Sequence, residues 1–538
     1  MKSELLVNIL SLMVLSGVIP VITLLLQFFL VGLNMFHDHY NKCEAYFPNV
    51  AIIVPAWNEE KVIGNTIDML LSMDYPLSAL RIYIVDDGSS DSTPTILSNK
   101  QIQYPHNVVN VRRENGGQGK AYTLNYGLDF ILKDSWAEAV LIIDADVSFQ
   151  KDALRKMTRH LADPAIGAVT AYIKEGTLQR NIITDFIAYE YINAQAGARR
   201  AQNVLGVQAC LAGGAQLHSR RNIEAIGRKI DTSTLAEDTY TTFKTQIMHH
   251  RVIFDGNAQV QAEEPDTIVE LWIQRFRWAR GNIQLTKAFS KIWFRHGESG
   301  LGGIFFGLIW FSLALMPLVM IIVSIGSVAL FFIDKELSWL IFRFLAPLSA
   351  ITYLFCTLYT FFIDPITARR VWFAGLMFPG LISLTILAIS FAPNFFVPLF
   401  KSILPTQGFC CWHDAFILFM DLWISLCMLF AWLLYRMDMA GFPRKITNFL
   451  LIFVGYGALL CAITFCAYIA QIRNIKISWV KTVKIGKKMH TISKIEKAPI
   501  FSEDLAKDIR HERKLFLYEL LVMMIVIGIL LLRHYYEF

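Results

Sequence analysis

Long apolar runs stand at both ends of the chain, and a region of mixed character separates them. The first run covers residues 5–33 and contains no charged side chain. It exceeds the roughly 20 residues that cross a bilayer, is too long for the core of a signal peptide, and lacks a small-residue cleavage pattern. We therefore expect residues 1–47 to contain an N-terminal transmembrane helix.

Six further apolar runs follow residue 300, and each is near or above the length of a membrane span. They cover about 304–333, 337–363, 370–392, 413–435, 446–471 and 515–533. Residues 301–538 are therefore predicted to form a transmembrane region, which brings the candidate spans to about seven.

The connectors between these runs carry the information about topology. The segment 472–514 is dense in lysine, which favours the cytoplasmic side of the membrane. If every run crosses once from a cytoplasmic central domain, however, simple counting places this segment outside. We therefore expect one run between 304 and 471 to be re-entrant or to lie in the membrane interface.

The region between the apolar ends has a different pattern of hydrophobic and polar residues. From residue 48 to about 265, short β-branched runs alternate with amphipathic stretches, a pattern typical of a βαβ domain. Residues 266–300 continue as amphipathic helices suited to the membrane interface. The chain is thus predicted to combine one cytoplasmic α/β domain with a helical membrane region.

Composition agrees with this division. Of the 538 residues, 54% are hydrophobic and only 17% are charged, and the mean hydropathy is +0.43, which excludes a soluble globular protein of this length. The net charge of +6 matches the Lys and Arg of cytoplasmic loops, so it does not indicate a nucleic-acid partner. The eight cysteines show no CxxC spacing and indicate neither a zinc site nor a disulfide framework.

Acidic residues follow two of the predicted strands in the first part of the α/β domain. A buried strand at 50–55 opens onto a helix, and a second strand at 81–85 ends in Asp86 and Asp87. These acids have two uses that the pattern leaves open. They can cap the next helix, or a carboxylate at a strand's end can accept an N–H of a nucleobase.

Two further motifs suit the binding of a diphosphate. Gly116 to Lys120 opens a predicted helix, whose N-terminus and lysine favour anions, although glycine-rich turns are common. A strand at 139–143 then ends in Asp144 and Asp146. On an extended chain these carboxylates point the same way and can share a hard divalent cation with phosphate oxygens.

The last motifs lie on predicted helices. Glu237 and Asp238 precede a helical stretch, where acids are favoured by the helix dipole. Gln274, Arg277 and Trp278 share one face of an amphipathic helix that begins near residue 266. That face offers an amide, a guanidinium and an indole to phosphates or sugars, but it is also typical of an interfacial membrane helix.

The order of these motifs is more specific than any one of them. The series consists of PAWNE at 55–59, VDDGSSD at 85–91, GGQGK at 116–120, DAD at 144–146, LAEDT at 235–239 and QRFRW at 274–278. It resembles the family-2 glycosyltransferases, and the TED-like and QxxRW boxes are similar to those of the processive cellulose, hyaluronan, chitin and poly-N-acetylglucosamine synthases. The TED-like box has Ala236 where the family usually has Thr.

The resemblance implies a fold and a donor site. The fold is an α/β GT-A (Rossmann-like) catalytic domain combined with an α-helical transmembrane bundle. Asp87 contacts the base of a UDP-sugar, and Lys120 holds the diphosphate. Asp144 and Asp146 bind Mg²⁺ or Mn²⁺, with Asp146 as the direct ligand. Asp238 is the general base.

It also implies an acceptor site and a loop that closes over the donor. Gln274, Arg277 and Trp278 contact the acceptor and the diphosphate. The family's acceptor-binding loop is expected at 210–214, where this sequence departs from its better-known members. Trp479, Thr482 and Lys484 resemble the FxVTxK gating loop of cellulose synthases, although an ordinary charged loop beside the membrane also explains them.

Three functions remain to be compared. The first is a processive, inverting synthase in the plasma membrane that polymerises a UDP-sugar onto a growing polysaccharide and exports the product across the lipid bilayer. The second is a non-processive transferase that acts on a membrane lipid. The third, a non-enzymatic channel or transporter with a nucleotide-binding domain, is disfavoured because the chain has no GxxxxGK[ST] motif. The residues fix neither the sugar, with glucose or N-acetylglucosamine expected from the resemblance, nor the oligomeric state.

Overall fold

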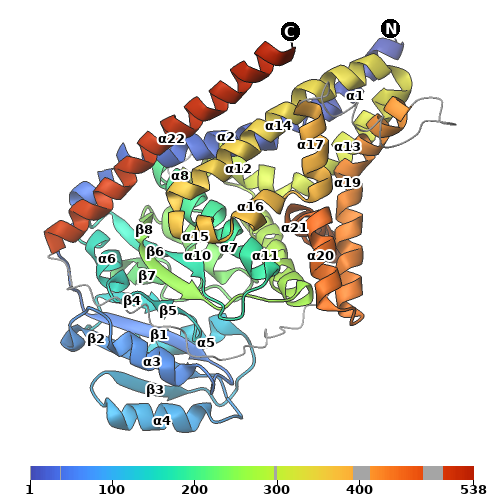
Figure 1. The fold of residues 1–538 in the computed structure, drawn as a ribbon. Helices are drawn as coiled ribbons and strands as arrows, with labels where there is room; N and C mark the ends of the chain where they lie inside the picture. The colour runs from blue at the N-terminus through green and yellow to red at the C-terminus, as the bar shows by residue number, and fades with distance from the viewer. Residues whose placement is uncertain (1, 37, 296–299, 392–411, 476–500, 538) are drawn as a thin grey trace.

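A computed structural model describes residues 2–36, 38–295, 300–391, 412–475 and 501–537. An α/β domain lies on one side of the molecule, and a bundle of long helices covers the other (Figure 1). The expected gating-loop residues Trp479, Thr482 and Lys484 lie outside the described residues.

One mixed sheet of eight strands forms the centre of the α/β domain. The strands lie in the order β3-β2-β1-β4-β7-β6-β8-β5. The half formed by β3, β2, β1 and β4 is parallel, whereas β7 is antiparallel to both of its neighbours. The bounds are β1 (Val50–Ala56), β2 (Leu80–Asp86), β3 (Val108–Arg112), β4 (Ala139–Ile142), β5 (Ser148–Phe149), β6 (Ile166–Glu175), β7 (Gln216–Ser219) and β8 (Arg251–Ala262).

Helices pack on both faces of the sheet. They are α3 (Ile63–Leu71), α4 (Thr93–Gln103), α5 (Lys120–Ile131), α6 (Ala153–His160), α7 (Ile182–Tyr191), α8 (Ala198–Val204), α9 (Arg220–Ala225), α10 (Glu237–Ile247) and α11 (Ile268–Ala288). A π-helical turn, Ile192–Gly197, joins α7 to α8, and short 3₁₀ turns cover Asn34–Phe36, Asp38–Lys42, Leu77–Ala79 and Gly300–Gly302.

Strand β1 shows why this half of the sheet could be predicted from the sequence. Ile52 belongs to the core on the face that α3 covers, and Ile53 belongs to the core on the face that α5 covers. A strand buried on both faces has a continuous apolar sequence. Gly127 lets α5 approach closely, because a Cβ there would lie 2.4 Å from Cδ1 of Ile53. The carboxyl ends of β1, β2 and β4 therefore meet at one edge, where ligands of such sheets bind.

The remaining helices make up the bundle. They are α1 (Lys2–Leu15), α2 (Val18–Leu33), α12 (Ile304–Ala314), α13 (Met316–Ile333), α14 (Lys335–Ile363), α15 (Pro365–Arg370), α16 (Trp372–Met377), α17 (Leu381–Phe391), α19 (Trp412–Met439), α20 (Arg444–Val454), α21 (Tyr456–Ile472) and α22 (Phe501–Glu537). Among the described residues, four segments are long and apolar enough to cross a membrane: Glu4–Lys42, Met316–Ile333, Lys335–Ile363 and Asp414–Met439.

The expected continuous span at 370–392 is wrong. Pro379 and Gly380, which has a φ of 89°, divide it into the short helices α16 and α17. The run at 446–471 is bent by 94° at Gly455 into α20 and α21, either as a broken span or as a re-entrant loop. The two breaks pack on each other, since a Cβ on Gly455 would lie 2.5 Å from the Pro379 carbonyl. The sequence led us to expect one run between 304 and 471 to be re-entrant or interfacial, and the structure breaks two runs, whose breaks are in contact.

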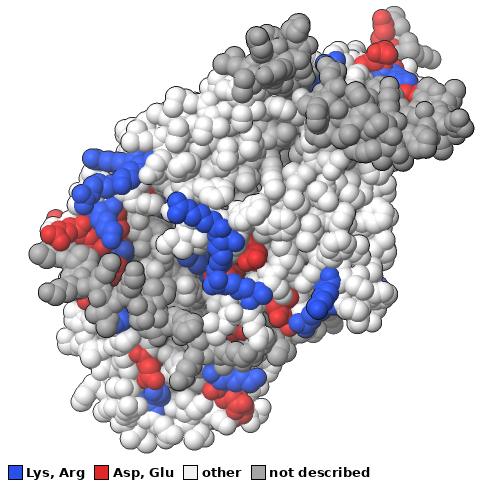
Figure 2. Space-filling view, viewed as in Figure 1, with Lys and Arg blue, Asp and Glu red and all other residues white. Residues whose placement is uncertain are grey.

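Charges are unevenly distributed over the molecule. Figure 2 shows basic and acidic side chains gathered over the α/β domain and its junction with α22, while the face of the bundle between its two ends is largely uncharged. Buried ion pairs join α22 to the α/β domain: Arg155 with Asp504 at 3.3 Å, Arg159 with Asp508 at 2.9 Å, and Arg200 with Glu512 at 2.8 Å.

Candidate active site

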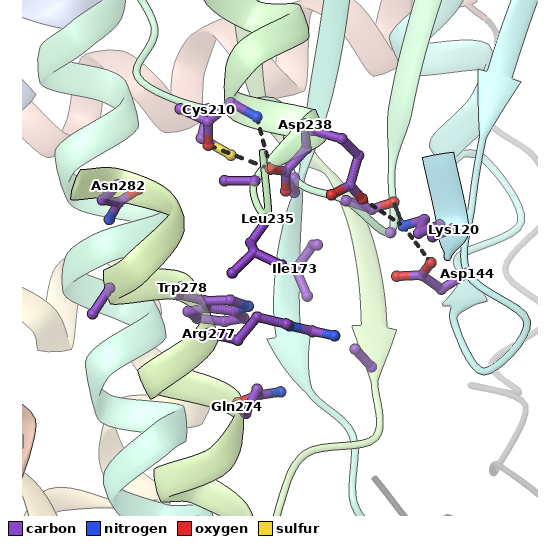
Figure 3. Close-up of a pocket in the computed structure, with 18 of the residues that line it drawn as sticks. Lys120, Asp144, Ile173, Cys210, Leu235, Asp238, Gln274, Arg277, Trp278 and Asn282 are labelled. Carbon is purple, nitrogen blue, oxygen red and sulfur yellow. Dashed lines mark hydrogen bonds and ion pairs between the residues drawn. The ribbon is translucent and has the colours of Figure 1, made fainter. Parts of the chain in front are cut away.

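A cavity of about 1400 Å³ extends from the carboxyl edge of the sheet to the apolar helices α12 and α21. Figure 3 shows part of its lining. Eight residues that the sequence predicts for the site line this one cavity: Asp87, Lys120, Asp144, Asp146, Asp238, Gln274, Arg277 and Trp278. The structure therefore brings together, in one space, motifs that are spread over almost 200 residues of the chain.

Lys120 lies at the centre of the charged part of the cavity. It is the first residue of α5, its Nζ is 2.5 Å from Oδ1 of Asp144, and it donates a hydrogen bond of 3.2 Å to the carbonyl of Gly213. Burial alone would lower the pKa of Lys120, but the neighbouring carboxylates of Asp144 and Glu237 outweigh it and raise the pKa. The lysine is therefore charged at neutral pH and available to an anion.

Gly213 marks the point where three predicted residues converge. A Cβ on Gly213 would lie 3.3 Å from Oδ2 of Asp238, 3.4 Å from Nζ of Lys120 and 4.0 Å from Oδ2 of Asp144. The absence of a side chain leaves this space open to a ligand. The loop at 210–214, in which the sequence departs from its better-known relatives, thus forms one wall of the charged centre.

Asp238 lies in the first turn of α10. Its Oδ1 accepts a hydrogen bond of 2.7 Å from the backbone N–H of Thr239, which satisfies one of the free donors at the helix N-terminus. Oδ2 of the same carboxylate lies beside Gly213, at the cavity. The capping and the chemical interpretations of this acid are therefore compatible. Burial and the charge of Asp238 also raise the pKa of the neighbouring Glu237.

The two acids of the DAD motif do not lie on an extended strand, which corrects the expectation from their spacing. Strand β4 ends at Ile142, and Asp144 to Val147 form a turn in which the N–H of Val147 donates to the carbonyl of Asp144 at 3.3 Å. Asp144 is half-buried and paired with Lys120, whereas Asp146 is buried. Both still line the cavity.

The chemistry of this pair fits a divalent cation. Carboxylate oxygens are the ligands that Mg²⁺ and Mn²⁺ prefer. In the part of the chain that the structure describes, no three metal-ligating side chains form a cluster. Asp144 and Asp146 would therefore supply two ligands, and oxygens of a bound diphosphate and water would complete the set.

Asp87 is held in a more crowded environment than the sequence indicated. It is buried, forms an ion pair with Arg113, and accepts a hydrogen bond of 2.9 Å from the N–H of Gly117. Arg113 also donates to Oε1 of Gln118 at 2.8 Å. Gly116 is required here, because a Cβ would lie 1.8 Å from the carbonyl oxygen of Asp87. Sequence reasoning missed Arg113, whose signal was its place directly after strand β3.

The QRFRW segment, residues 274–278, forms the opposite wall. It lies on α11, which begins as expected after Thr267, whose Oγ1 accepts from the N–H of Glu270 at 3.1 Å. Figure 3 shows Gln274, Arg277 and Trp278 on the side of α11 that faces the cavity. No described residue forms a hydrogen bond or ion pair with Arg277, so its guanidinium can receive an anionic ligand.

The cavity ends among apolar and aromatic side chains of the bundle. Phe306, Trp310 and Leu313 of α12 and Tyr468 of α21 line this end. Tyr468 donates a hydrogen bond to the carbonyl of Ala314, and this contact joins the two helices. The polar half of the cavity therefore continues into a part of the molecule whose sequence is typical of a membrane.

Comparison with known proteins shows which family the domain around this cavity matches. Residues 48–281 match the protein family described as "Glycosyltransferase like family 2". These residues, which make up less than half of the chain, therefore form a family-2 glycosyltransferase domain. The matched residues include the QRFRW segment, and the fold class expected from the sequence is confirmed.

Similar proteins with described activities fall into two groups. The chain is 32% identical over 238 residues to the beta-monoglucosyldiacylglycerol synthase of Synechocystis sp., which is 44% of this chain and 48% of that protein. It is 27% identical over 237 residues to the poly-beta-1,6-N-acetyl-D-glucosamine synthase of Staphylococcus epidermidis, 44% of this chain and 55% of that protein. The chain thus spans about half the length of the curated relatives that it matches.

Among solved structures, one similar protein is the mannosyltransferase PcManGT from Pyrobaculum calidifontis, crystallised with GDP-Man and Mn²⁺. The identity is 21%, the TM-score is 0.45, and the match covers 73% of this chain and 99% of that one.

Proposed function

We propose that the chain is a processive, inverting glycosyltransferase that extends a polysaccharide from a UDP-sugar and passes the product through its membrane helices. One observation carries the proposal. The charged centre around Lys120 and Asp238, the wall formed by Trp278, and the apolar helices α12 and α21 all line the same cavity.

The charged half suits the donor. Lys120 and Arg277 can neutralise a diphosphate in a site that is partly shielded from water, where such contacts are stronger than in solution. Asp144 and Asp146 would hold Mg²⁺ or Mn²⁺, and the metal, when bound, supplies further positive charge against the leaving diphosphate. Asp87 and Arg113 would form the base-binding end of the same site.

We assign the proton transfer to Asp238. Its carboxylate would take the proton of an acceptor hydroxyl as that oxygen attacks the anomeric carbon. A bond from the acceptor oxygen to the anomeric carbon forms, and the bond from that carbon to the phosphate oxygen breaks. UDP leaves with the bonding electrons, and attack from the opposite side inverts the anomeric centre.

The other half suits a sugar acceptor. The indole of Trp278 is 37% exposed and lies on the cavity wall, where a pyranose ring can pack against it. Trp310 continues the aromatic lining towards the membrane, and its Nε1 donates to Oγ1 of Thr286 at 2.9 Å. A growing chain would leave the charged centre along this aromatic path.

A lipid acceptor is the second candidate. Leu313 and Leu315 line the membrane end of the cavity and are 64% and 39% exposed, so apolar chains can reach this opening from the bilayer. One group of relatives carries the name of a lipid glucosyltransferase. In this alternative the donor site and the role of Asp238 are unchanged, and only one sugar is transferred.

The product separates the two candidates. The purified chain in lipid nanodiscs is incubated with Mg²⁺ or Mn²⁺ and a panel of radiolabelled nucleotide-sugars that includes UDP-glucose and UDP-N-acetylglucosamine. Label in a high-molecular-weight product supports the processive synthase, whereas label in a single-sugar glycolipid supports the alternative. No transfer and no hydrolysis from any donor would contradict both.

A further inference from the structure

Arg275, the second residue of the QRFRW segment, has a different environment from Gln274, Arg277 and Trp278. This residue is 5% exposed and does not line the cavity, although Gln274, Arg277 and Trp278 do. A buried guanidinium must be paired with a charge or with hydrogen-bond acceptors to offset the cost of desolvation. Its partners therefore indicate what this arginine holds in place.

The guanidinium contacts both the amide and the indole of the cavity wall. Its Cζ lies 4.0 Å from the ring centroid of Trp278, and its Nη1 donates to Oε1 of Gln274 at 2.8 Å. Its Nη2 donates to Oε2 of Glu190 at 2.9 Å. One planar group thus joins two residues that face the cavity to a carboxylate on α7.

That carboxylate is itself fixed by the bundle. Oε2 of Glu190 also accepts a hydrogen bond of 2.7 Å from the hydroxyl of Tyr456. Tyr456 is fully buried and is the first residue of α21, directly after the bend at Gly455. Arg275 is therefore connected through Glu190 to the broken helix pair at the membrane.

The amide of Gln274 is held at its second atom as well. Nε2 of Gln274 donates to Oε2 of Glu264 at 3.2 Å, and Oε1 of Glu264 accepts from the hydroxyl of Tyr191 at 2.6 Å. Because Arg275 occupies the oxygen of the same amide, both ends of the Gln274 side chain have a defined partner.

We infer that Arg275 is a positioning residue that orients Trp278 and Gln274 towards the acceptor, and that Glu190 anchors it. The inference rests on the proposed function, since it assigns the face formed by these residues to the acceptor. Lysine does not replace the arginine, because its ammonium lacks the planar fork that stacks on the indole while donating to two oxygens in fixed directions. Loss of this orientation leaves the donor site intact and misaligns the acceptor hydroxyl with Asp238.

The test compares sugar transfer with hydrolysis of the donor by water. Full-length Arg275→Lys in nanodiscs is given the UDP-sugar that the wild type uses, and both transferred and free sugar are counted. We expect the ratio of transfer to hydrolysis to fall by about tenfold, which corresponds to the loss of one desolvated cation–π contact. UDP affinity should stay within about twofold, because the donor-binding residues are unchanged.

Arg81→Lys is the matched control. Arg81 also stacks on an indole, with its Cζ 3.9 Å from the ring centroid of Trp136, but it lies on β2 away from the cavity. Its substitution should leave the ratio unchanged. Glu190→Gln, which keeps an acceptor for Tyr456 and removes the charge that anchors Arg275, should lower the ratio as Arg275→Lys does, and it replaces that variant if Arg275→Lys does not fold.

A double-mutant cycle shows whether the effect passes through the indole. In a Trp278→Leu background, Arg275→Lys or Glu190→Gln should lower the ratio by clearly less than in the wild-type background, because the indole is gone and only Gln274 is still positioned. Fully additive effects, or a fall in transfer and hydrolysis together, would overturn the inference and make Arg275 a structural residue. Absence of transfer by the wild type would instead contradict the proposed function.

Discussion

Single residues determine how the charged centre of the cavity is formed. Gly213 leaves the space between Asp238 and Lys120 open, with a virtual Cβ 3.3 and 3.4 Å from their polar atoms. We expect Gly213→Ala to lower both donor affinity and transfer rate, because the methyl group occupies this space without striking the backbone. Gly64→Ala on α3 is the control, since its Cβ would meet only a methyl carbon of Ile96 at 3.5 Å. If Gly213→Ala keeps the donor affinity and the transfer rate of the wild type, the reacting atoms do not lie beside Gly213.

The metal assignment also depends on one residue. Asp146→Asn replaces a charged oxygen ligand by a neutral amide, so we expect donor binding in Mg²⁺ or Mn²⁺ to weaken and transfer to be lost. Isothermal titration with UDP, with and without the metal, measures the first effect. Asp129→Asn, an exposed acid on α5, serves as the control. Full activity of Asp146→Asn, or of the wild type in excess chelator, would show that transfer does not need a metal held by Asp146.

Among the elements of the bundle, α22 is joined to the α/β domain by several buried ion pairs. Glu512 is 2% exposed and contacts Arg200 through Nε and Nη2 at 2.8 to 3.1 Å. Glu512→Gln leaves the buried Arg200 without its counter-charge, which typically costs about 3–5 kcal/mol. We expect a clearly lower thermal unfolding temperature in detergent, whereas Glu503→Gln on the exposed side of α22 should change little. Equal unfolding temperatures of the two variants would contradict a stabilising role of the ion pair between Glu512 and Arg200.

Elements whose signal is local were predictable from the sequence. Strand β1 is a continuous apolar run because both of its faces are buried, and α11 begins directly after Thr267, whose side chain caps the helix. Asp144 and Lys120 were assigned to one site because each follows a strand or opens a helix at the same sheet edge. Their direct ion pair of 2.5 Å was not predictable, since it depends on packing between elements.

Features that arise only from tertiary contacts were missed for the same reason. Arg275 and Glu190 are 85 residues apart, and neither position carries a local pattern that indicates the other. The breaks at Gly380 and Gly455 interrupt runs that are uniformly apolar, so hydropathy alone predicted continuous spans. The DAD acids were placed on an extended chain because their spacing fits one, but the strand ends before Asp144.

For the whole molecule, the arrangement in the membrane follows from where the ends of the helices lie. The α/β domain is predicted to be cytoplasmic, so the opposite end of the bundle, where Lys335 of α14 pairs with Asp414 of α19, should face outward. A membrane-impermeant thiol reagent on intact cells should label Glu336→Cys but not Ile102→Cys, which is 79% exposed on α4. Labelling of Ile102→Cys before lysis would reverse the topology and contradict a cytoplasmic donor site.

The central claim is that one cavity binds a nucleotide-sugar and that Asp238 removes the proton of the acceptor within it. Asp238→Asn tests the claim most directly, because Asn caps a helix about as well as Asp but cannot act as a base. With protein purified in nanodiscs, UDP affinity should remain within about threefold of the wild type, while transfer falls by ~10²–10⁴-fold. Normal transfer by Asp238→Asn would show that this carboxylate only caps α10 and would contradict the account.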